Sequence, residues 1–295
     1  MNGRSSYIGR FAPSPSGPLH FGSLLAALAS YLDAKAHNGL WLLRMEDLDP
    51  AREPKGTADQ ILNCLDQLSL HWDGEVVYQS NRLNAYAEAL HILQSKGLIY
   101  SCNCTRQQVQ AMGGVYDNRC RTRSDKVIGG ALRLQTTKTQ ICFTDSIQGE
   151  QSQDLFYECG DFVLVRKDGL FAYQLAVVVD DEFQGITDVV RGFDLLDSTP
   201  RQIYLQQCLR YTQPRYAHIP VAVNSEGQKL SKQHFADAID PLQASQLLYR
   251  ALLFLGQQPD PALQSAQIED LLTWAIARWD IQAVPKLANI LHESV

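Results

Sequence analysis

The sequence predicts an α/β fold, and two features near its amino terminus indicate it. A short β-type run, Tyr7 to Phe11, breaks into the Pro- and Gly-rich loop APSPSGP, and a Leu- and Ala-rich helix then runs to a stop at Asn38-Gly39. A second apolar run of strand length, Gly39 to Met45, ends in the charged segment EDLDPAR. Strand, helix and strand in this order form a βαβ unit. Glu46 is therefore expected at the carboxyl edge of a parallel sheet, where α/β folds bind ligands.

The middle of the chain predicts further helices and a change of pattern. Thr57 to Leu68 and Asn84 to Leu98 have helical spacing. From about 99 to 165, cysteines, β-branched residues and turns replace clean helices, which indicates an inserted module. FVLVRKDGLFAYQLAVVV then predicts a hairpin around Asp168-Gly169 followed by a core strand.

The end of the chain completes the predicted organisation. From Ala236 to Val295 we expect helices, and this stretch is acidic, with seven Asp or Glu against three Lys or Arg. We therefore predict four parts. Residues 1–98 and 166–235 would form two halves of one α/β domain, 99–165 the inserted module and 236–295 a helical region.

Composition limits the class of protein. With 45% hydrophobic and 20% charged residues, 295 residues can bury a sizeable core. The amino terminus has no apolar signal core, and the longest apolar stretch, Leu170 to Val179, is too short for a bilayer and contains Gln174. We expect a cytoplasmic protein with no membrane partner. The net charge of -6 gives no overall attraction to a polyanion, so a nucleic acid would need a local basic surface.

The stretch PLHFG places His20 at the start of the first long helix. A helix amino terminus carries unsatisfied N–H groups and the positive end of the helix dipole, and flanking glycines let a phosphate approach the backbone. His20 would add a directional donor to the same anion. The alternative is that His20 only caps the helix. Gly17 and Gly22 also have the spacing of a P-loop, but Ser23 stands where that motif requires lysine.

A second segment, QKLSKQ at 228–233, holds two lysines after a turn at Asn224 to Gly227. Alone, it is better explained as a solvated basic turn than as a site. Together with PLHFG it resembles the two signatures of class I aminoacyl-tRNA synthetases, which lie on opposite halves of one Rossmann-like sheet and close on ATP. The resemblance implies an ATP site formed by Pro18, Leu19, His20, Gly22, Lys229, Leu230, Ser231 and Lys232.

The resemblance becomes narrower over four ordered blocks. RFAPSPSGPLHFGS, LLRMEDLDPAR, AYQLAVVVDDEFQGITDVVRGFDLLDSTPRQ and KLSKQ resemble the catalytic core of glutamyl-tRNA synthetases over roughly residues 7 to 235. Arg10 and Arg191 suit glutamate because guanidinium groups form forked hydrogen bonds with carboxylates. By resemblance, Glu46 would hold the substrate ammonium. The implied glutamate site is Arg10, Phe11, Ala12, Pro13, Ser14, Glu46, Tyr173 and Arg191.

Two members of this implied site also have plainer explanations. Arg191 is equally well explained by a surface ion pair with Asp188 or Asp194. Tyr173 is equally well explained by a place in the core.

The resemblance also implies a mechanism. The α-carboxylate of glutamate attacks the α-phosphorus of ATP and displaces pyrophosphate, and negative charge builds on phosphate oxygens. His20 and Lys232 are the catalytic candidates because they would meet that charge, with Mg²⁺ bound to the phosphates of ATP. No side chain has to act as a nucleophile, so catalysis would rest on positioning and electrostatics.

The predicted insertion contains a candidate metal site in SCNCTRQQVQAMGGVYDNRCRTR. Cys102 and Cys104 are two apart and Cys120 is sixteen residues further on, so three thiolates can meet on one tetrahedral zinc. Seven cysteines, an odd number, favour thiols and metal ligands over disulfides. From spacing alone, reduced structural thiols are an equal alternative. The resembling synthetases share this C-x-C, Y-x-x-x-C arrangement, which implies one structural Zn²⁺ with Tyr116 as fourth ligand. We expect buried thiols at Cys64, Cys142, Cys159 and Cys208.

The stretch after the second signature is shorter than the resemblance to glutamyl-tRNA synthetases would imply. A full glutamyl-tRNA synthetase continues into helical domains that read the anticodon, whereas about sixty residues come after KLSKQ. A truncated, zinc-containing core resembles the glutamyl-queuosine tRNA(Asp) synthetases. This implies activation of L-glutamate without tRNA and its transfer, by a monomer, to the queuosine at the wobble position of tRNA(Asp). A basic cluster after the cysteines suits an RNA backbone or a solvated loop: Arg119, Arg121, Arg123 and Lys126.

Two other functions remain open from the sequence. A minimal enzyme that charges the 3' end of tRNA(Glu) would use the same activation residues. A non-catalytic synthetase core that binds RNA or a protein would have no need of both phosphate signatures, and the chain holds both.

Overall fold

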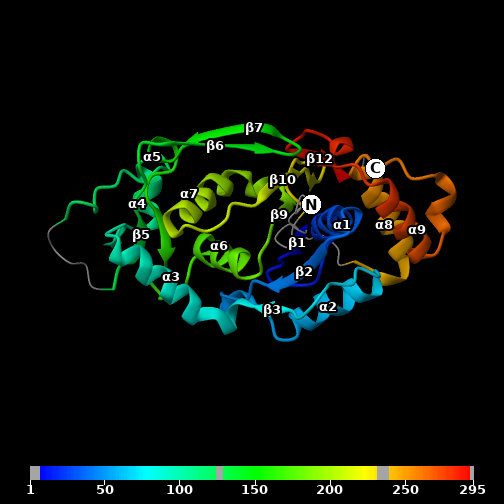
Figure 1. Ribbon diagram of the computed structural model, residues 1–295, viewed down its shortest axis with the longest axis horizontal. Coiled ribbons are helices and arrows are strands. Elements are labelled where there is room, and N and C mark those ends of the chain that lie inside the picture. Colours follow the sequence, from blue (N-terminus) through cyan, green and yellow to red (C-terminus); the bar gives the residue numbers. More distant parts are fainter. Residues whose placement is uncertain (1–6, 124–128, 231–238, 293–295) are drawn as a thin grey trace, which may run out of the picture.

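Parallel strands form the centre of the molecule (Figure 1). The computed structural model describes residues 7–123, 129–230 and 239–292. β1 (Ile8–Phe11), β2 (Leu40–Met45) and β3 (Val77–Tyr78) pair in parallel in that order. β9 (Asp188–Gly192) pairs in parallel with β10 (Arg215–Ile219). The two groups meet at Thr187, whose N–H donates to the Ile8 carbonyl at 2.9 Å.

A long antiparallel hairpin extends the second group of strands. It consists of β6 (Gln140–Asp145) and β7 (Gly149–Asp154), and it runs along the top of Figure 1. Asp145 at the end of β6 pairs in parallel with Tyr216 of β10, which gives a sheet of order β7-β6-β10-β9. Part of the predicted inserted module therefore shares a sheet with the predicted second half, while the borders of the four parts stay predictions.

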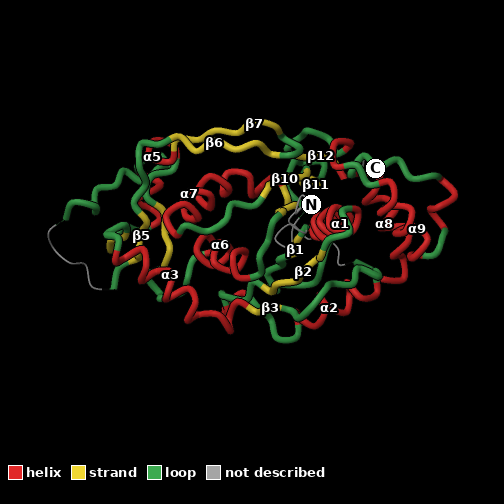
Figure 2. Tube along the Cα trace, in the orientation of Figure 1, coloured by secondary structure: helices red, strands yellow, loops and turns green. Residues whose placement is uncertain are grey.

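Helices cover both faces of the central strands (Figure 2). Val190 and Ala217 face the apolar core around α1, whereas Val189 and Tyr216 face the core around α6. Neighbouring strand residues point to opposite faces, so strands covered on both sides are apolar throughout. The first core includes α1 (Phe21–Ala36), α2 (Thr57–Gln67), α8 (Ala244–Phe254) and α9 (Ile268–Arg278), and the second α3 (Leu83–Ser95), α6 (Tyr173–Phe183) and α7 (Thr199–Leu209).

The remaining elements lie around this centre. A small antiparallel sheet contains β4 (Ile99–Cys102), β5 (Ala131–Leu134) and β8 (Phe162–Val165), near the short helices α4 (Arg106–Ala111) and α5 (Leu155–Glu158). β11 (Val221–Val223) pairs in parallel with β12 (Asn289–Leu291). Among the described helices, none combines the length and apolar character that crossing a bilayer requires.

One predicted element is wrong. The stretch AYQLAVVV was expected to be a core strand, but residues 173–183 form α6. Its residues from Leu175 to Asp181 are all buried, so the segment has no polar face and no helical period. Without that period, the β-branched run Val177 to Val179 suggests a strand. The turn before it is confirmed, since Arg166 N–H donates to the Leu170 carbonyl at 2.8 Å.

The buried carboxylate of Asp180 joins α6 to α3 and to the residues just before α3. Asp180 accepts hydrogen bonds from Gln79 Nε2 at 2.9 Å, Arg82 Nε at 2.5 Å and Tyr86 Oη at 2.6 Å. The side chain of Asp180 is wholly buried, and that of Arg82 is partly buried, with 15% of it exposed. Removing this charge would leave the arginine without its buried counter-ion.

We therefore predict that Asp180→Asn lowers the free energy of unfolding by about 3 kcal/mol or more. Asp168→Asn is the control, because the ion pair of Asp168 with Arg166 is exposed and worth about 1 kcal/mol at most. Urea denaturation measures both. Equal effects of the two substitutions would show that the buried network does not hold α6 in place.

Candidate active site

A cavity of about 700 Å³ lies at the carboxyl ends of the central strands. Most of the predicted ATP and glutamate residues line it. Pro18 is described but is not among the lining residues, and Ser231 and Lys232 lie outside the described residues. The predicted residues that line the cavity are Arg10, Phe11, Ala12, Pro13, Ser14, Leu19, His20, Gly22, Glu46, Tyr173, Arg191, Lys229 and Leu230.

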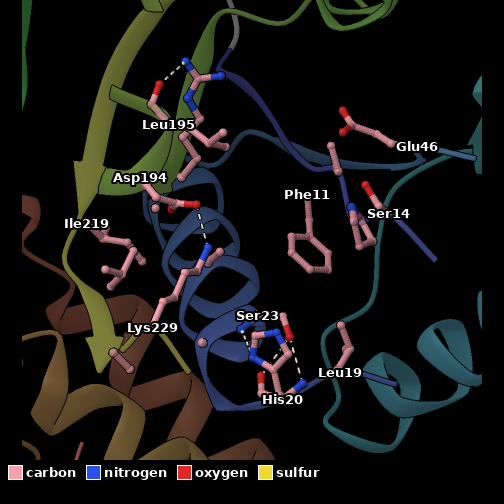
Figure 3. A pocket seen from close by; sticks show the side chains of 18 of the residues that line it. Phe11, Ser14, Leu19, His20, Ser23, Glu46, Asp194, Leu195, Ile219 and Lys229 are labelled. Carbon is pink, nitrogen blue, oxygen red and sulfur yellow. Dashed lines mark hydrogen bonds and ion pairs between the residues drawn. The ribbon is translucent and has the colours of Figure 1, made fainter. Parts of the chain in front are cut away.

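Strands β1 and β2 place Glu46, one of the acidic residues that line the cavity. Glu46 directly follows β2, and its backbone N–H donates to the Pro13 carbonyl in the loop after β1 at 3.0 Å. Because the two strands are parallel, their carboxyl ends meet at one edge of the sheet. The expected position of Glu46 is confirmed, and Figure 3 shows it beside Ser14, across Phe11 from His20.

Buried charges support this side of the cavity. Asp181 accepts hydrogen bonds from Arg44 Nη1 at 2.8 Å and Arg10 Nε at 3.4 Å, and Arg44 Nη2 lies 3.5 Å from Glu46 Oε1. Burial raises the pKa of the Glu46 carboxyl, and the charges of Arg44 and Arg10 oppose that rise only in part. Arg44 and Asp181 were not predicted. Their signal was a charged residue inside an apolar run, as in LLRM and VVVDD.

Arg191 is not a surface residue, and the predicted alternative of an ion pair is wrong. Its side chain is buried, and it donates to His218 Nε2 at 3.0 Å and to Thr199 Oγ1 at 2.8 Å. Nη1 donates to the Tyr173 hydroxyl at 3.4 Å. Tyr173 is half-buried: it packs against the core around α6 and also lines the cavity, so the core position and the cavity position both hold. The suggested partners are used elsewhere: Asp188 binds Arg215 and Asp194 binds Lys229.

His20 is the amino-terminal cap of α1. Its Nδ1 accepts from the Ser23 N–H at 3.3 Å, and Ser23 Oγ accepts from the His20 N–H at 2.8 Å. His20 therefore does cap the helix, and it also lines the cavity together with Ser23. A ring fixed in this way stands beside the amino-terminal N–H groups of the helix, where an anion is stabilised.

The second lysine segment approaches the same helix terminus. Lys229 Nζ lies 2.6 Å from Asp194 Oδ2 in the cavity wall (Figure 3). A Cβ added at Gly22 would lie 3.2 Å from the Leu230 carbonyl oxygen, so glycine permits this approach. On the other side of the undescribed stretch 231–238, Ile239 N–H donates to the Leu19 carbonyl at 3.0 Å. The described residues on both sides of Lys232 therefore contact PLHFG.

Three cysteines and a tyrosine converge in the predicted insertion. The Sγ atoms of Cys102, Cys104 and Cys120 lie within 4.8 Å of one another, with 3.6 Å between Cys104 and Cys120. Tyr116 Oη is 3.3 Å from Cys102 Sγ and 3.9 Å from Cys104 Sγ. Thiolates on one tetrahedral zinc lie about 3.8 Å apart, so this donor set fits the metal. Burial raises the pKa of Cys102, but hydrogen bonds with Tyr116 and Arg133 outweigh it and lower that pKa to about 7.

The other cysteines and the basic cluster differ from expectation in part. Cys142 is exposed because β6 alternates and places it on the solvent face, while Cys64, Cys159 and Cys208 are half-buried.

In the basic cluster, Arg119 pairs with Asp117 at 2.5 Å, and Arg121 Nε donates to Asp161 at 3.0 Å. Lys126 lies outside the described residues. The two described ion pairs reduce the free positive charge of this cluster.

Sequence comparisons agree with this geometry. Residues 8–254 match the family described as tRNA synthetases class I (E and Q), catalytic domain. The chain is 52% identical over 286 residues to the "Glutamyl-Q tRNA(Asp) synthetase" of Pseudomonas putida strain KT2440, which covers 97% of this chain and 95% of the relative. The chain belongs to the class I tRNA synthetases, in the group of the glutamyl-Q tRNA(Asp) synthetases. A Pseudomonas aeruginosa protein of that name is 50% identical and covers 98% of this chain and 99% of its own length.

Solved structures support the fold of this family. The crystal structure of glutamate-tRNA synthetase from Elizabethkingia anophelis is similar with a TM-score of 0.79 and 24% identity, over 96% of this chain and 67% of that chain. A glutamate tRNA ligase from Elizabethkingia meningosepticum, solved in complex with its amino acid, is similar with a TM-score of 0.78 and 24% identity, over 96% of this chain and 66% of that chain. The predicted α/β class I catalytic fold is confirmed.

The capping role of His20 predicts different stabilities for two substitutions. His20→Ala removes the cap and should lower the free energy of unfolding by about 1 kcal/mol, whereas His20→Asn supplies a good cap and should change it by about 0.5 kcal/mol or less. Chemical denaturation measures both. An equal loss in the two variants would show that the ring stabilises the helix by packing and not by capping.

Proposed function

We propose that this protein activates L-glutamate with ATP, without tRNA, and transfers the glutamate to the queuosine at the wobble position of tRNA(Asp). The observation that carries the proposal is one cavity with two chemically different ends. A helix amino terminus with His20 and Lys229 suits phosphates, and Glu46 with Arg10 and Arg191 suits an amino acid that carries two carboxylates. The names of the relatives supply the acceptor.

Each end of the cavity would have its own task in the first step. Glu46 would bind the substrate ammonium, and the two arginines would bind its carboxylates, so that the α-carboxylate meets the α-phosphorus of ATP. A C–O–P link forms and the bond to pyrophosphate breaks. His20, the α1 terminus and Lys232 would stabilise the charge that develops on the phosphate oxygens. Mg²⁺ bound to ATP would supply further positive charge to the phosphates.

The second step moves the activated acyl group. A hydroxyl of the queuosine cyclopentenediol would attack the carboxyl carbon of glutamyl-adenylate and lose its proton. An ester forms, and the C–O bond to phosphate breaks to release AMP. The reaction needs no enzyme nucleophile, because the adenylate is already an activated acyl donor. The monomeric state and the cytoplasmic location stay predictions.

We also propose that Cys102, Cys104, Tyr116 and Cys120 hold one structural Zn²⁺. The convergence of four donor atoms supports this, and the closed set leaves no open position for substrate. Such a site would tie β4 to the segment that follows it. The metal would contribute stability to the small sheet, away from the ATP and glutamate cavity.

Labelled glutamate tests the proposed function. Purified protein with ATP and [14C]glutamate is given tRNA from cells that make queuosine and tRNA from cells that do not. Label in the queuosine-containing tRNA alone supports the proposal. Equal label in both identifies an enzyme that charges the 3' end of tRNA(Glu). No glutamate-dependent pyrophosphate exchange by zinc-loaded protein identifies a non-catalytic core.

The cap-preserving variant also tests the phosphate role of His20. His20→Asn keeps a helix cap but removes the imidazole, so we expect its rate of glutamate-dependent pyrophosphate exchange to fall about 100-fold. Its unfolding midpoint should match the wild type. A variant that is both stable and fully active would leave His20 as a cap alone.

Metal analysis tests the cysteine site. We expect about one zinc per chain by elemental mass spectrometry, most of it lost in Cys120→Ser. Cys142→Ser is the matched control, because that thiol is exposed and lies outside the cluster. Loss of zinc should also lower the unfolding midpoint. Equal zinc in the two variants would contradict the site.

A further inference from the structure

His218 lies behind the cavity, directly beside Arg191. It is on β10, opposite Arg191 in the parallel register with β9, and its side chain is completely buried. Its Nε2 is 3.0 Å from Arg191 Nε, and its Nδ1 is 2.6 Å from Asp145 Oδ2. His218 does not line the cavity but contacts Arg191, which does.

The hydrogen bonds define which nitrogen of His218 carries the proton. An arginine side chain only donates, so Nε2 must be the acceptor. Nδ1 then carries the hydrogen and donates to Asp145. The Asp145 Oδ1 atom accepts from the N–H groups of Ile147 at 3.0 Å and Gln148 at 2.9 Å, as expected of an ionised carboxylate.

The surroundings of His218 keep its imidazole ring neutral. Burial and then the charge of Arg191 lower the pKa of His218 to about 4, although Asp145 opposes that shift. Burial raises the pKa of Asp145, but its hydrogen bond with His218 leads the contacts that lower it overall. A neutral imidazole between a carboxylate and a guanidinium avoids placing two positive charges side by side.

These contacts fix the orientation of the guanidinium. Nε donates to His218, and Nη2 donates to Thr199 Oγ1 and, at 3.4 Å, to the Leu195 carbonyl. Nη1 donates to Tyr173, which lines the cavity. Nε is thus bound by the buried His218, Nη2 by the buried Thr199 and by the cavity residue Leu195, and Nη1 by the cavity residue Tyr173.

We infer that His218 is a positioning residue for substrate recognition: held by Asp145, it orients Arg191 so that Nη1 faces a carboxylate of glutamate. The inference rests on the proposed function for the identity of the substrate. It also gives the β6–β7 hairpin a role in the site, because Asp145 ends β6 and is linked to the cavity through His218 and Arg191.

Two substitutions of similar size separate orientation from stability. His218→Gln places an acceptor oxygen near the position of Nε2 and can still bind Arg191. His218→Asn keeps a donor near Nδ1 for Asp145 but is too short to reach Arg191. We expect the KM for glutamate to rise about tenfold or more in His218→Asn and about threefold or less in His218→Gln. The KM for ATP should stay unchanged in both.

The measurement is pyrophosphate exchange at saturating ATP or saturating glutamate, with unfolding midpoints recorded for each variant. An unchanged KM for glutamate in His218→Asn would overturn the inference. So would an equal rise of both KM values in both variants, because that pattern indicates general damage to the fold.

Nitrogen NMR of the wild-type protein and of the two variants tests the inference without a measurement of activity. The inference requires the Nδ1-protonated tautomer of His218 and a slowly exchanging Nε–H of Arg191 that is kept in His218→Gln and lost in His218→Asn. An Nε2-protonated ring would overturn it. Absence of glutamate-dependent exchange in the wild type would instead reject the proposed function and leave this test standing.

Discussion

Two buried arginines at the floor of the cavity, each about 4% exposed, set the constraint on which the site depends. A guanidinium taken out of water is costly unless its charge is matched and its donors are bound. Arg10 meets this requirement through Asp181, which it shares with Arg44. The donors of Arg191 are bound by His218 and Thr199, but these two partners are uncharged. Arg191 is therefore neutralised less than Arg10 by its direct partners, and it attracts a bound anion more strongly.

The cavity joins two kinds of anion recognition. At one end lies the amino terminus of α1, where the backbone N–H groups are positive without any ionised side chain and Gly22 makes them accessible. The other end uses side-chain charges whose positions are fixed by buried partners. Phe11 stands between the two ends (Figure 3). This arrangement suits a reaction in which two anionic groups must be brought together, because each receives its own positive environment and mutual repulsion is reduced.

The segment from 99 to 165 contributes to the molecule in two separate ways. Its cysteines and Tyr116 form a compact cluster next to the small β4-β5-β8 sheet. Its β6–β7 hairpin runs back along the molecule to β10 (Figure 1), and there Asp145 supports His218. A segment expected from its composition to be a separate module therefore supplies Asp145, which contacts the cavity residue Arg191 through His218.

The sequence by itself determined the local features: the first βαβ unit, Glu46 at a sheet edge, His20 at a helix start and the cysteine spacing, each carried by residues close together in the chain. Its resemblance to known blocks assembled the list of lining residues. Only the tertiary structure decided that Val177 to Val179 lie in a helix, because a segment buried on every side carries no period. It also decided the support of Arg191, since Asp145 and His218 are 73 residues apart and no local pattern encodes a contact made by the packing of separate strands.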